Sequence, residues 1–183
     1  MNYNIEKSKW LMSLPEKYRP NSVQKIVAVS NEDTRNKVYF GDRQSGRTLM
    51  LLLDTLYEAI NTPIIRICVM ASSVNSTRIL ANKLQEIITD CGLENRVVRI
   101  MRNPNKIEFE NGTVILFLNR DIDFRGQCID RLYIDNLETI NQYTLEAATA
   151  RTLIFRDSKI IANCIPNPPE IAARFIEGLL RGN

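Results

Sequence analysis

The order of hydrophobic and polar positions along the chain predicts strands that alternate with helices. The short apolar run Lys37–Phe40 predicts a strand, and residues Leu49–Ile60, which are apolar on nearly every side, predict a buried helix. The almost continuous apolar run Ile64–Ala71 is typical of a strand buried on both faces of a parallel sheet. Alternation of this kind is typical of α/β proteins.

The same pattern continues to the end of the chain. Ser72 or Ser73 can cap a helix that Gly92 ends. The expected apolar face of this helix consists of Ile79, Leu80, Leu84, Ile87, Ile88 and Cys91. Asn111-Gly112, the strongest two-residue turn signal, predicts a hairpin between residues 106–110 and 113–118. The other predicted elements are strands at Arg96–Met101, Arg131–Asp135 and Lys159–Ala162, and helices at Leu137–Thr149 and Glu170–Leu180.

These elements predict an α/β fold with a mainly parallel sheet flanked by helices and a β-hairpin around residues 106–118. Residues 1–36 are mixed and polar, and Pro15 and Pro20 exclude a long helix there, although residues 21–30 can form a short one. We expect one domain overall, in which residues 1–36 form an N-terminal segment and residues 37–183 the main body.

A phosphate-binding loop is predicted between the first strand and its helix. Gly41-Asp42-Arg43-Gln44-Ser45-Gly46-Arg47-Thr48 fits the pattern G-x-x-x-x-G-[KR]-T. The backbone N–H groups of such a loop and the positive end of the following helix bind phosphate. Arg47 stands where lysine is usual, and it presents a planar fork instead of a compact charge. The alternative is a glycine turn that binds no ligand.

An acidic residue at the end of a later strand supplies a second half of the predicted site. Asp135 follows an apolar strand, and ligands of parallel sheets bind beyond the carboxyl ends of the strands. A carboxylate there can hold Mg²⁺ opposite the hydroxyl of Thr48. Asn136 follows, and its amide can orient a water molecule but cannot accept a proton. Glu138 can substitute as the base if it points inward; the alternative is a solvated residue in the first turn of a helix.

Composition narrows the possible functions without selecting one. The 183 residues carry a net charge of +3, which permits nucleic-acid binding but does not indicate it. The absence of histidine excludes histidine bases and histidine zinc ligands. Four scattered cysteines, none in a C-x-x-C pair, predict reduced core residues of an intracellular protein. The N-terminus lacks the apolar core of a signal peptide, and no stretch approaches the ~20 apolar residues that cross a bilayer.

Taken together in order, the motifs resemble those of the ATPase domain of the large terminase subunit, the DNA-packaging motor of tailed bacteriophages. The loop Asp42–Thr48 is similar to the family's phosphate loop, and Ile107–Thr113 is similar to its hairpin. Phe124-Arg125-Gly126 and then Leu132–Asp135 resemble the segment that leads to the metal aspartate. Lys159-Ile160-Ile161 and Pro166-Asn167 resemble the coupling segment.

The resemblance implies a P-loop NTPase fold of the RecA/ASCE type that binds ATP and Mg²⁺. Thr48 and Asp135 are the expected metal residues, and Gln24 corresponds to an adenine-contacting glutamine. The expected catalytic residues are Arg43, as a γ-phosphate sensor or arginine finger, Asn136 and Glu138. The nucleotide-binding residues are Gln24, Gly41, Asp42, Arg43, Gln44, Ser45, Gly46, Arg47 and Thr48. The implied partners are double-stranded DNA, the portal, the small terminase subunit and other copies in a ring on the portal, in the cytoplasm of an infected host cell.

Departures from the family pattern keep three functions open. Lysine is replaced by Arg47, the catalytic glutamate by Asn136, and the coupling threonines by Asn163, Cys164 and Ile165. The chain can therefore be a DNA-translocating ATPase, a nucleotide-binding or assembly module that does not hydrolyse ATP, or a helicase-like ATPase outside packaging. It also lacks the family's nuclease domain, which suggests a fragment, a split subunit or a reduced relative. The isolated chain is expected to be mostly monomeric.

Basic residues in the middle of the chain are candidates for contacts with DNA phosphates. They are Arg96, Arg99, Arg102, Lys106, Arg120, Arg125 and Arg131. No aromatic residues are interleaved with them to stack on single-stranded bases. Binding is therefore expected to involve the backbone and to depend steeply on salt; the alternative is a solvated sheet edge and loop.

Overall fold

The fold is built on a seven-stranded sheet with the order β1-β7-β6-β2-β5-β4-β3. The computed structural model describes residues 3–21, 24, 36–102, 105–119, 128–152 and 157–181. The strands are β1 Asn36–Phe40, β2 Arg66–Ala71, β3 Val97–Arg102, β4 Asn105–Phe109, β5 Val114–Asn119, β6 Arg131–Ile134 and β7 Lys159–Cys164. Neighbours from β1 to β5 are parallel, and β4 pairs antiparallel with both β5 and β3. The predicted α/β class, mainly parallel sheet and hairpin are confirmed.

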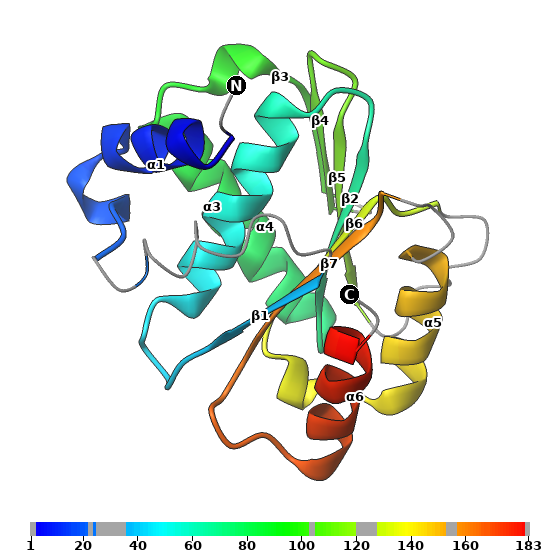
Figure 1. Cartoon of the computed structure of the whole chain (residues 1–183). Coiled ribbons are helices and arrows are strands. Elements are labelled where there is room, and N and C mark those ends of the chain that lie inside the picture. The colour runs from blue at the N-terminus through cyan, green and yellow to red at the C-terminus, as the bar shows by residue number, and fades with distance from the viewer. Residues whose placement is uncertain are drawn as a thin grey trace.

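Helices cover both faces of this sheet (Figure 1). The α-helices are α1 Tyr3–Ser13, α3 Arg47–Asn61, α4 Val74–Asp90, α5 Gln142–Thr152 and α6 Glu170–Arg181, and the short 3₁₀ turns are η1 Glu16–Tyr18, η2 Glu94–Arg96 and η3 Leu137–Thr139. α3 and α4 lie on one face, with α1 outside α3, and α5 and α6 lie on the other face. Ser73 caps α4 by accepting a hydrogen bond from the backbone N–H of Ser76, as its sequence predicts.

Two hydrophobic cores lie where the helices pack on the sheet, one on each face. One includes residues from α1, α3, α4 and one sheet face, and the other includes residues from α5, α6 and the opposite face. All ten residues from Met50 to Ala59 of α3 are buried, which confirms the apolar character that its sequence indicates. Burial of about 25 cal/mol per Å² of apolar surface makes these two layers the main source of stability.

α1 is a helix that the mixed, polar N-terminal sequence did not indicate. The helix has eleven residues and ends at Ser13, before Pro15. Its Lys7 side chain is buried and forms an ion pair with Asp54 of α3. Trp10 packs on Tyr57 of α3 with ring centroids 5.2 Å apart. α1 is therefore attached to the helix that follows the phosphate loop.

The helix expected over Leu137–Thr149 is divided into two pieces. η3 ends at Thr139, and α5 begins at Gln142. Asn136 has the left-handed conformation, with φ of +53°, and Asn141 caps α5 by accepting a hydrogen bond from the N–H of Thr144 at 2.9 Å. The continuous helix was a wrong prediction because two asparagines fix turns within it.

The cysteine prediction is confirmed for two of the four residues. Cys68 and Cys164 are buried, whereas Cys91 is half-buried and Cys128 is exposed. Cys128 is therefore not a core residue, because it lies just before β6 and outside the packed layers. Within the described ranges, no helix has the length and apolar character required to span a membrane.

Candidate functional site

The predicted phosphate loop connects β1 to α3 by a tight turn. Gly46 has φ of +80°, and Gln44 also has a positive φ of +65°, which is unusual for a residue other than glycine. A Cβ atom on Gly46 would lie 2.5 Å from Nε2 of Gln24, and one on Gly41 would collide with Oγ of Ser45. The backbone of this turn therefore favours glycine at position 46, whereas a side chain at position 41 would require Ser45 to move.

Gln24 lies directly against the loop. Its Nε2 donates to the carbonyl oxygen of Ser45 at 2.6 Å. Asn21 fixes the same residue, because the two exchange backbone and side-chain hydrogen bonds of 2.8 and 2.9 Å. The expected contact of Gln24 with adenine stays a prediction. The remainder of the short helix expected at residues 21–30 lies outside the described residues, Asn21 and Gln24 excepted.

Thr48 and Asp135 meet across two elements that are far apart in sequence. Thr48 lies in the first turn of α3, and its Oγ1 donates to Oδ1 of Asp135 at 2.8 Å. Asp135 directly follows β6 and is 5 % exposed. Since β7 separates β1 from β6, the loop and the acid approach each other over the end of β7.

Asn163, near the end of β7, is a central residue of the site that sequence analysis noted only as a departure. Its Nδ2 donates to Oδ1 of Asp135 at 2.7 Å, and its Oδ1 accepts the N–H of Asn136 at 2.7 Å. The side chain is fully buried. The sequence signal for it was only a polar residue at the end of an apolar strand.

The side chain of Asn136 hydrogen-bonds to the second carboxylate oxygen of Asp135. Its Nδ2 donates to Oδ2 of Asp135 at 2.8 Å, so Asp135 accepts hydrogen bonds from three side chains. Its left-handed backbone is a conformation that asparagine adopts more readily than glutamate. The replacement of the usual glutamate by asparagine therefore agrees with the local backbone.

Arg47 points away from solvent and is paired within the protein. Its Nη1 donates to the carbonyl oxygen of Gly41 at 2.9 Å. Its Nη2 donates to Oδ1 of Asn136 at 2.6 Å and to Oε1 of Glu138 at 2.8 Å. The side chains of Arg47 and Glu138 are 10 % and 12 % exposed. Glu138 is thus not the solvated residue of the alternative interpretation.

The second carboxylate oxygen of Glu138 has a different environment. Oε2 is buried and receives no hydrogen bond within the described part of the chain. The thiol of Cys164 is near this carboxylate. Burial, with a further contribution from Glu138, raises the pKa of Cys164 to about 11. The thiol is therefore neutral near pH 7, and it adds no charge to the site.

The loop and η3 enclose an open hollow of about 460 Å³. Its lining residues are Arg43, Gln44, Gly46, Arg47, Thr48, Asn136, Glu138 and Thr139. Arg43 and Gln44 are exposed at its rim, as is Asp42 nearby. A hollow of this volume is within the usual range for small-ligand sites. The structure therefore brings most of the predicted site residues together around one cavity.

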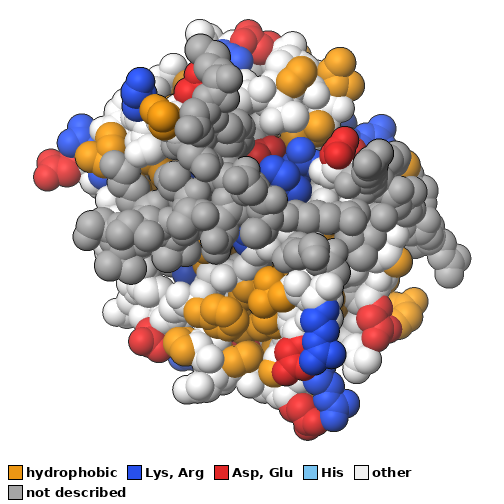
Figure 2. Space-filling model, viewed as in Figure 1, with side chains coloured by type: hydrophobic (Ala, Val, Ile, Leu, Met, Phe, Trp, Pro, Cys, Tyr) orange, Lys and Arg blue, Asp and Glu red, His pale blue; other side chains and the backbone are white. Residues whose placement is uncertain are grey.

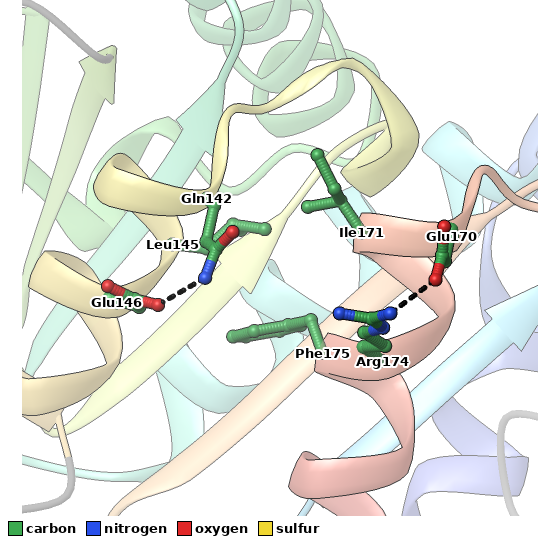
Figure 3. Close-up of a pocket in the computed structure, with 7 residues that line it drawn as sticks. All are labelled: Gln142, Leu145, Glu146, Glu170, Ile171, Arg174 and Phe175. Atoms are coloured by element: carbon green, nitrogen blue, oxygen red, sulfur yellow. Dashed lines mark hydrogen bonds and ion pairs between the residues drawn. The ribbon is translucent and has the colours of Figure 1, made fainter.

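A second hollow of about 260 Å³ lies between α5 and α6 (Figure 3). Phe175 and Leu145 form its apolar walls, and Arg174 pairs with Glu170 at its edge. No residue predicted to bind nucleotide lines it.

Three of the predicted basic residues are paired with acidic side chains. Arg96 pairs with Glu110, Lys106 with Glu108, and Arg131 with the buried Glu58. Arg99 and Arg102 are exposed on β3. Arg120 and Phe124-Arg125-Gly126 lie outside the described residues.

The donor set fits Mg²⁺ better than a metal that requires a cage of protein ligands. Among the described residues, no group of three or more Asp, Glu or Cys side chains could hold a metal ion. One hydroxyl and one carboxylate, from Thr48 and Asp135, are the protein contribution that Mg²⁺ needs when phosphates and water supply its other oxygens.

The fold and this site define a class of protein. The strand β1, the glycine-bounded loop and the helix α3 are consecutive in the sequence. Asp135 comes later and lies at the end of β6, two strands from β1 in the mainly parallel sheet. This is the arrangement of a P-loop NTPase. No protein-family model matches the sequence, and no curated protein does.

Solved structures nevertheless share this fold. The large terminase of bacteriophage HK97 has a TM-score of 0.80 at 13% identity, over 100% of this chain and 42% of the other. The large terminase ATPase domain of Thermus phage P74-26 has a TM-score of 0.72 at 16% identity, over 86% and 69%. The large terminase of the thermophilic bacteriophage D6E, in complex with ADP, has a TM-score of 0.64 at 16% identity, over 78% and 38%.

These similarities confirm the fold suggested by the terminase resemblance. The present chain spans less than half of the HK97 and D6E proteins, and two thirds of the P74-26 domain. At such identities the likeness concerns the fold alone.

Proposed function

We propose that the chain binds ATP with Mg²⁺ at the loop Gly41–Thr48 and hydrolyses it. The observation that carries this proposal is the 2.8 Å contact between Oγ1 of Thr48 and Oδ1 of Asp135. In P-loop enzymes, two protein groups hold Mg²⁺ beside the bound phosphates. One is a hydroxyl in the first turn of the helix that follows the loop, and the other is a carboxylate at the end of a separate strand.

The loop supplies the phosphate site. The loop and the first turn of α3 line the hollow, where the N–H groups of a helix N-terminus would bind phosphate, and we assign Arg43 at the rim to the terminal phosphate. We assign the contact with the adenine ring to Gln24, whose side chain donates to the carbonyl oxygen of Ser45. Structures of the D6E terminase with ADP and with ATP-γ-S support the choice of nucleotide. When bound, Mg²⁺ would neutralise charge on the phosphates.

Hydrolysis requires a base near the terminal phosphate, and we assign that role to Glu138. Its Oε2 is buried and accepts no hydrogen bond among the described residues, so the carboxylate can take a proton from the attacking water once the side chain turns towards the hollow. The water oxygen bonds to the γ-phosphorus, and the bond to the β–γ bridging oxygen breaks to release ADP. Asn136 can orient the water through its amide but is already bonded to Asp135 and Arg47.

The finer proposal is that hydrolysis drives packaging of double-stranded DNA. It rests on the terminase fold alone, with the portal, a small subunit and a ring of copies as the proposed partners. Exposed Arg99 and Arg102 are the described candidates for backbone contacts with DNA. The expected signature is duplex affinity that falls steeply between low and physiological salt.

Assembly with partners would require exposed hydrophobic surface. Figure 2 displays hydrophobic side chains gathered beside the alternating charges of α6. Phe40 at the end of β1 and Ile171 and Leu180 of α6 are each about half exposed, at 51%, 53% and 45%. Such side chains support a role in protein contacts. We expect the isolated chain to be monomeric, and light scattering tests this.

Steady-state phosphate release from Mg·ATP, with and without duplex DNA, tests the activity. Glu138→Gln is expected to lower kcat by ~10²–10⁴, because the general base is lost. Glu146→Gln removes an equal charge from an exposed position on α5 and is the control. Rapid hydrolysis that survives Glu138→Gln would contradict the assignment of the base.

The alternative is a module that binds ATP without hydrolysing it, and the altered residues Arg47 and Asn136 favour it. In that case the parent chain binds ATP with no turnover, and Asn136→Glu, alone or with Arg47→Lys, raises turnover. The left-handed backbone at residue 136 opposes glutamate by about 1–2 kcal/mol, so a small gain is expected. A helicase-like ATPase is the third candidate, and stimulation by single-stranded nucleic acid in the same assay would favour it.

A further inference from the structure

The guanidinium of Arg47 is engaged before any ligand arrives. Gly41, Asn136 and Glu138 each accept a hydrogen bond from it, at 2.9, 2.6 and 2.8 Å. Two of these acceptors belong to the segment after β6, so Arg47 joins the phosphate loop to η3. A lysine ammonium has no planar fork, and it could not reproduce this bridge with the same geometry.

The charge of Arg47 is also balanced within the protein. Its partner Glu138 has a side chain only 12 % exposed, so water screens this ion pair less than one on the surface. A phosphate that approaches Arg47 offers the same interaction that the Glu138 carboxylate already provides. The two anions therefore compete for one guanidinium, and their mutual repulsion prevents both from binding it closely.

The backbone that carries Glu138 is fixed, so only its side chain can withdraw. Leu137 is fully buried in the core that includes Ala172 and Ile176 of α6. The N–H of Thr139 donates to the carbonyl oxygen of Asn136 at 2.8 Å. A carboxylate displaced from Arg47 therefore stays beside the hollow, with neither oxygen bonded to the guanidinium.

We propose that Glu138 is an internal competitor of the nucleotide's phosphates, and that ATP binding releases it from Arg47 to act on water. In the empty site, Glu138 neutralises Arg47 and weakens phosphate binding. In the occupied site, the γ-phosphate takes its place on Arg47, and the freed carboxylate becomes the base. The Glu138 carboxylate thus lowers the affinity for nucleotide but is required for its hydrolysis. This inference rests on the proposed function.

Equilibrium binding of Mg·ATP-γ-S to the parent chain, Glu138→Gln and Glu146→Gln tests the inference. Glu138→Gln keeps the shape of the side chain but removes the competing charge, so its Kd is expected to fall about tenfold, the value of one charge-assisted hydrogen bond. The same variant is expected to lose turnover, whereas Glu146→Gln leaves both quantities unchanged. A residue with only a structural role would not improve binding while abolishing hydrolysis.

The outcomes separate this inference from the proposed function. If the parent chain binds and Glu138→Gln binds equally or more weakly, the competition is refuted and the nucleotide site stands. If no variant binds, the nucleotide site is refuted, and the competition with it. If Glu138→Gln does not fold, Glu138→Ala decides, because it removes the competing carboxylate and leaves Arg47: tighter binding supports the competition, and unchanged or weaker binding refutes it.

Discussion

Asn163 donates from Nδ2 to Oδ1 of Asp135 over 2.7 Å and accepts the backbone N–H of Asn136 at the same distance. One carboxamide therefore orients both the proposed metal carboxylate and the residue that follows it. Because β7 lies between β1 and β6, this contact also fixes the aspartate relative to the phosphate loop.

We predict that Asn163→Ala weakens nucleotide binding more than its loss of stability would explain. The change removes one of the three side-chain donors to Asp135 and leaves the N–H of Asn136 without its acceptor, at a cost of about 2–3 kcal/mol. Mg²⁺-dependent nucleotide affinity should fall at least severalfold. Thr152→Val is the control, because it removes a different buried hydrogen bond, to the carbonyl oxygen of Ala148. Equal effects of the two variants on affinity would contradict the role of Asn163.

Gly46→Ala is expected to prevent nucleotide binding without unfolding the chain. The new Cβ would lie 2.5 Å from Nε2 of Gln24, and φ of +80° is strained by about 1 kcal/mol for alanine. Gln24 must then leave its hydrogen bond with Ser45. Titration with a fluorescent ATP analogue measures the loss. Gly178→Ala in α6 has open space and is the control: it should bind like the parent and be more stable by about 1 kcal/mol.

Removal of one member of the Lys7–Asp54 ion pair should destabilise the fold strongly. Lys7→Met leaves the carboxylate of Asp54 buried beside α1, and such changes cost about 3–5 kcal/mol. Urea unfolding of the parent and of Lys7→Met measures the difference, and the exposed Lys9→Met is the control. The double variant Lys7→Met/Asp54→Leu should recover most of the loss. If it remains as unstable as the single variant, the penalty does not come from the unpaired charge.

The thiols should differ in their reactivity and in their effect on alkaline stability. Cys128 is exposed and should react quickly with a thiol reagent, whereas buried Cys68 and Cys164 should react only after unfolding. Burial raises the pKa of Cys164 to about 11, above its value in the unfolded chain, so the unfolded chain loses this proton first as pH rises. The contribution of the neutral Cys164 thiol to the free energy of unfolding is complete below pH 9 and is lost as pH rises towards 11. Cys164→Ser should show a shallower decline over this interval.

Much of the fold could be predicted because it depends on local sequence. The loop Gly41–Thr48, the buried helix α3 and the Asn111-Gly112 hairpin each have a signal within a few residues. Asp135 was also found, since a strand that ends in an acid is visible in the sequence.

The rest depends on partners that are distant in sequence. α1 looked too polar to pack because the partner of Lys7 lies 47 residues away. The Arg47–Glu138 pair joins residues 91 positions apart, so neither residue indicated the other. Asn163 could not be recognised as central until β7 was known to lie between β1 and β6. The break after η3 was missed because Asn136 and Asn141 favour turns only in their particular backbone conformations.

The position of β7 also has a consequence for synthesis of the chain. Among the described strands, β1 pairs only with β7, and Asn36 lies 124 residues before its neighbour Ile160. On a ribosome, the first strand therefore has no place in the sheet until β7, Lys159–Cys164, has been made. Non-local strand pairing of this kind is slow, so the nascent chain should acquire its ability to bind a ligand only in the last stage of folding.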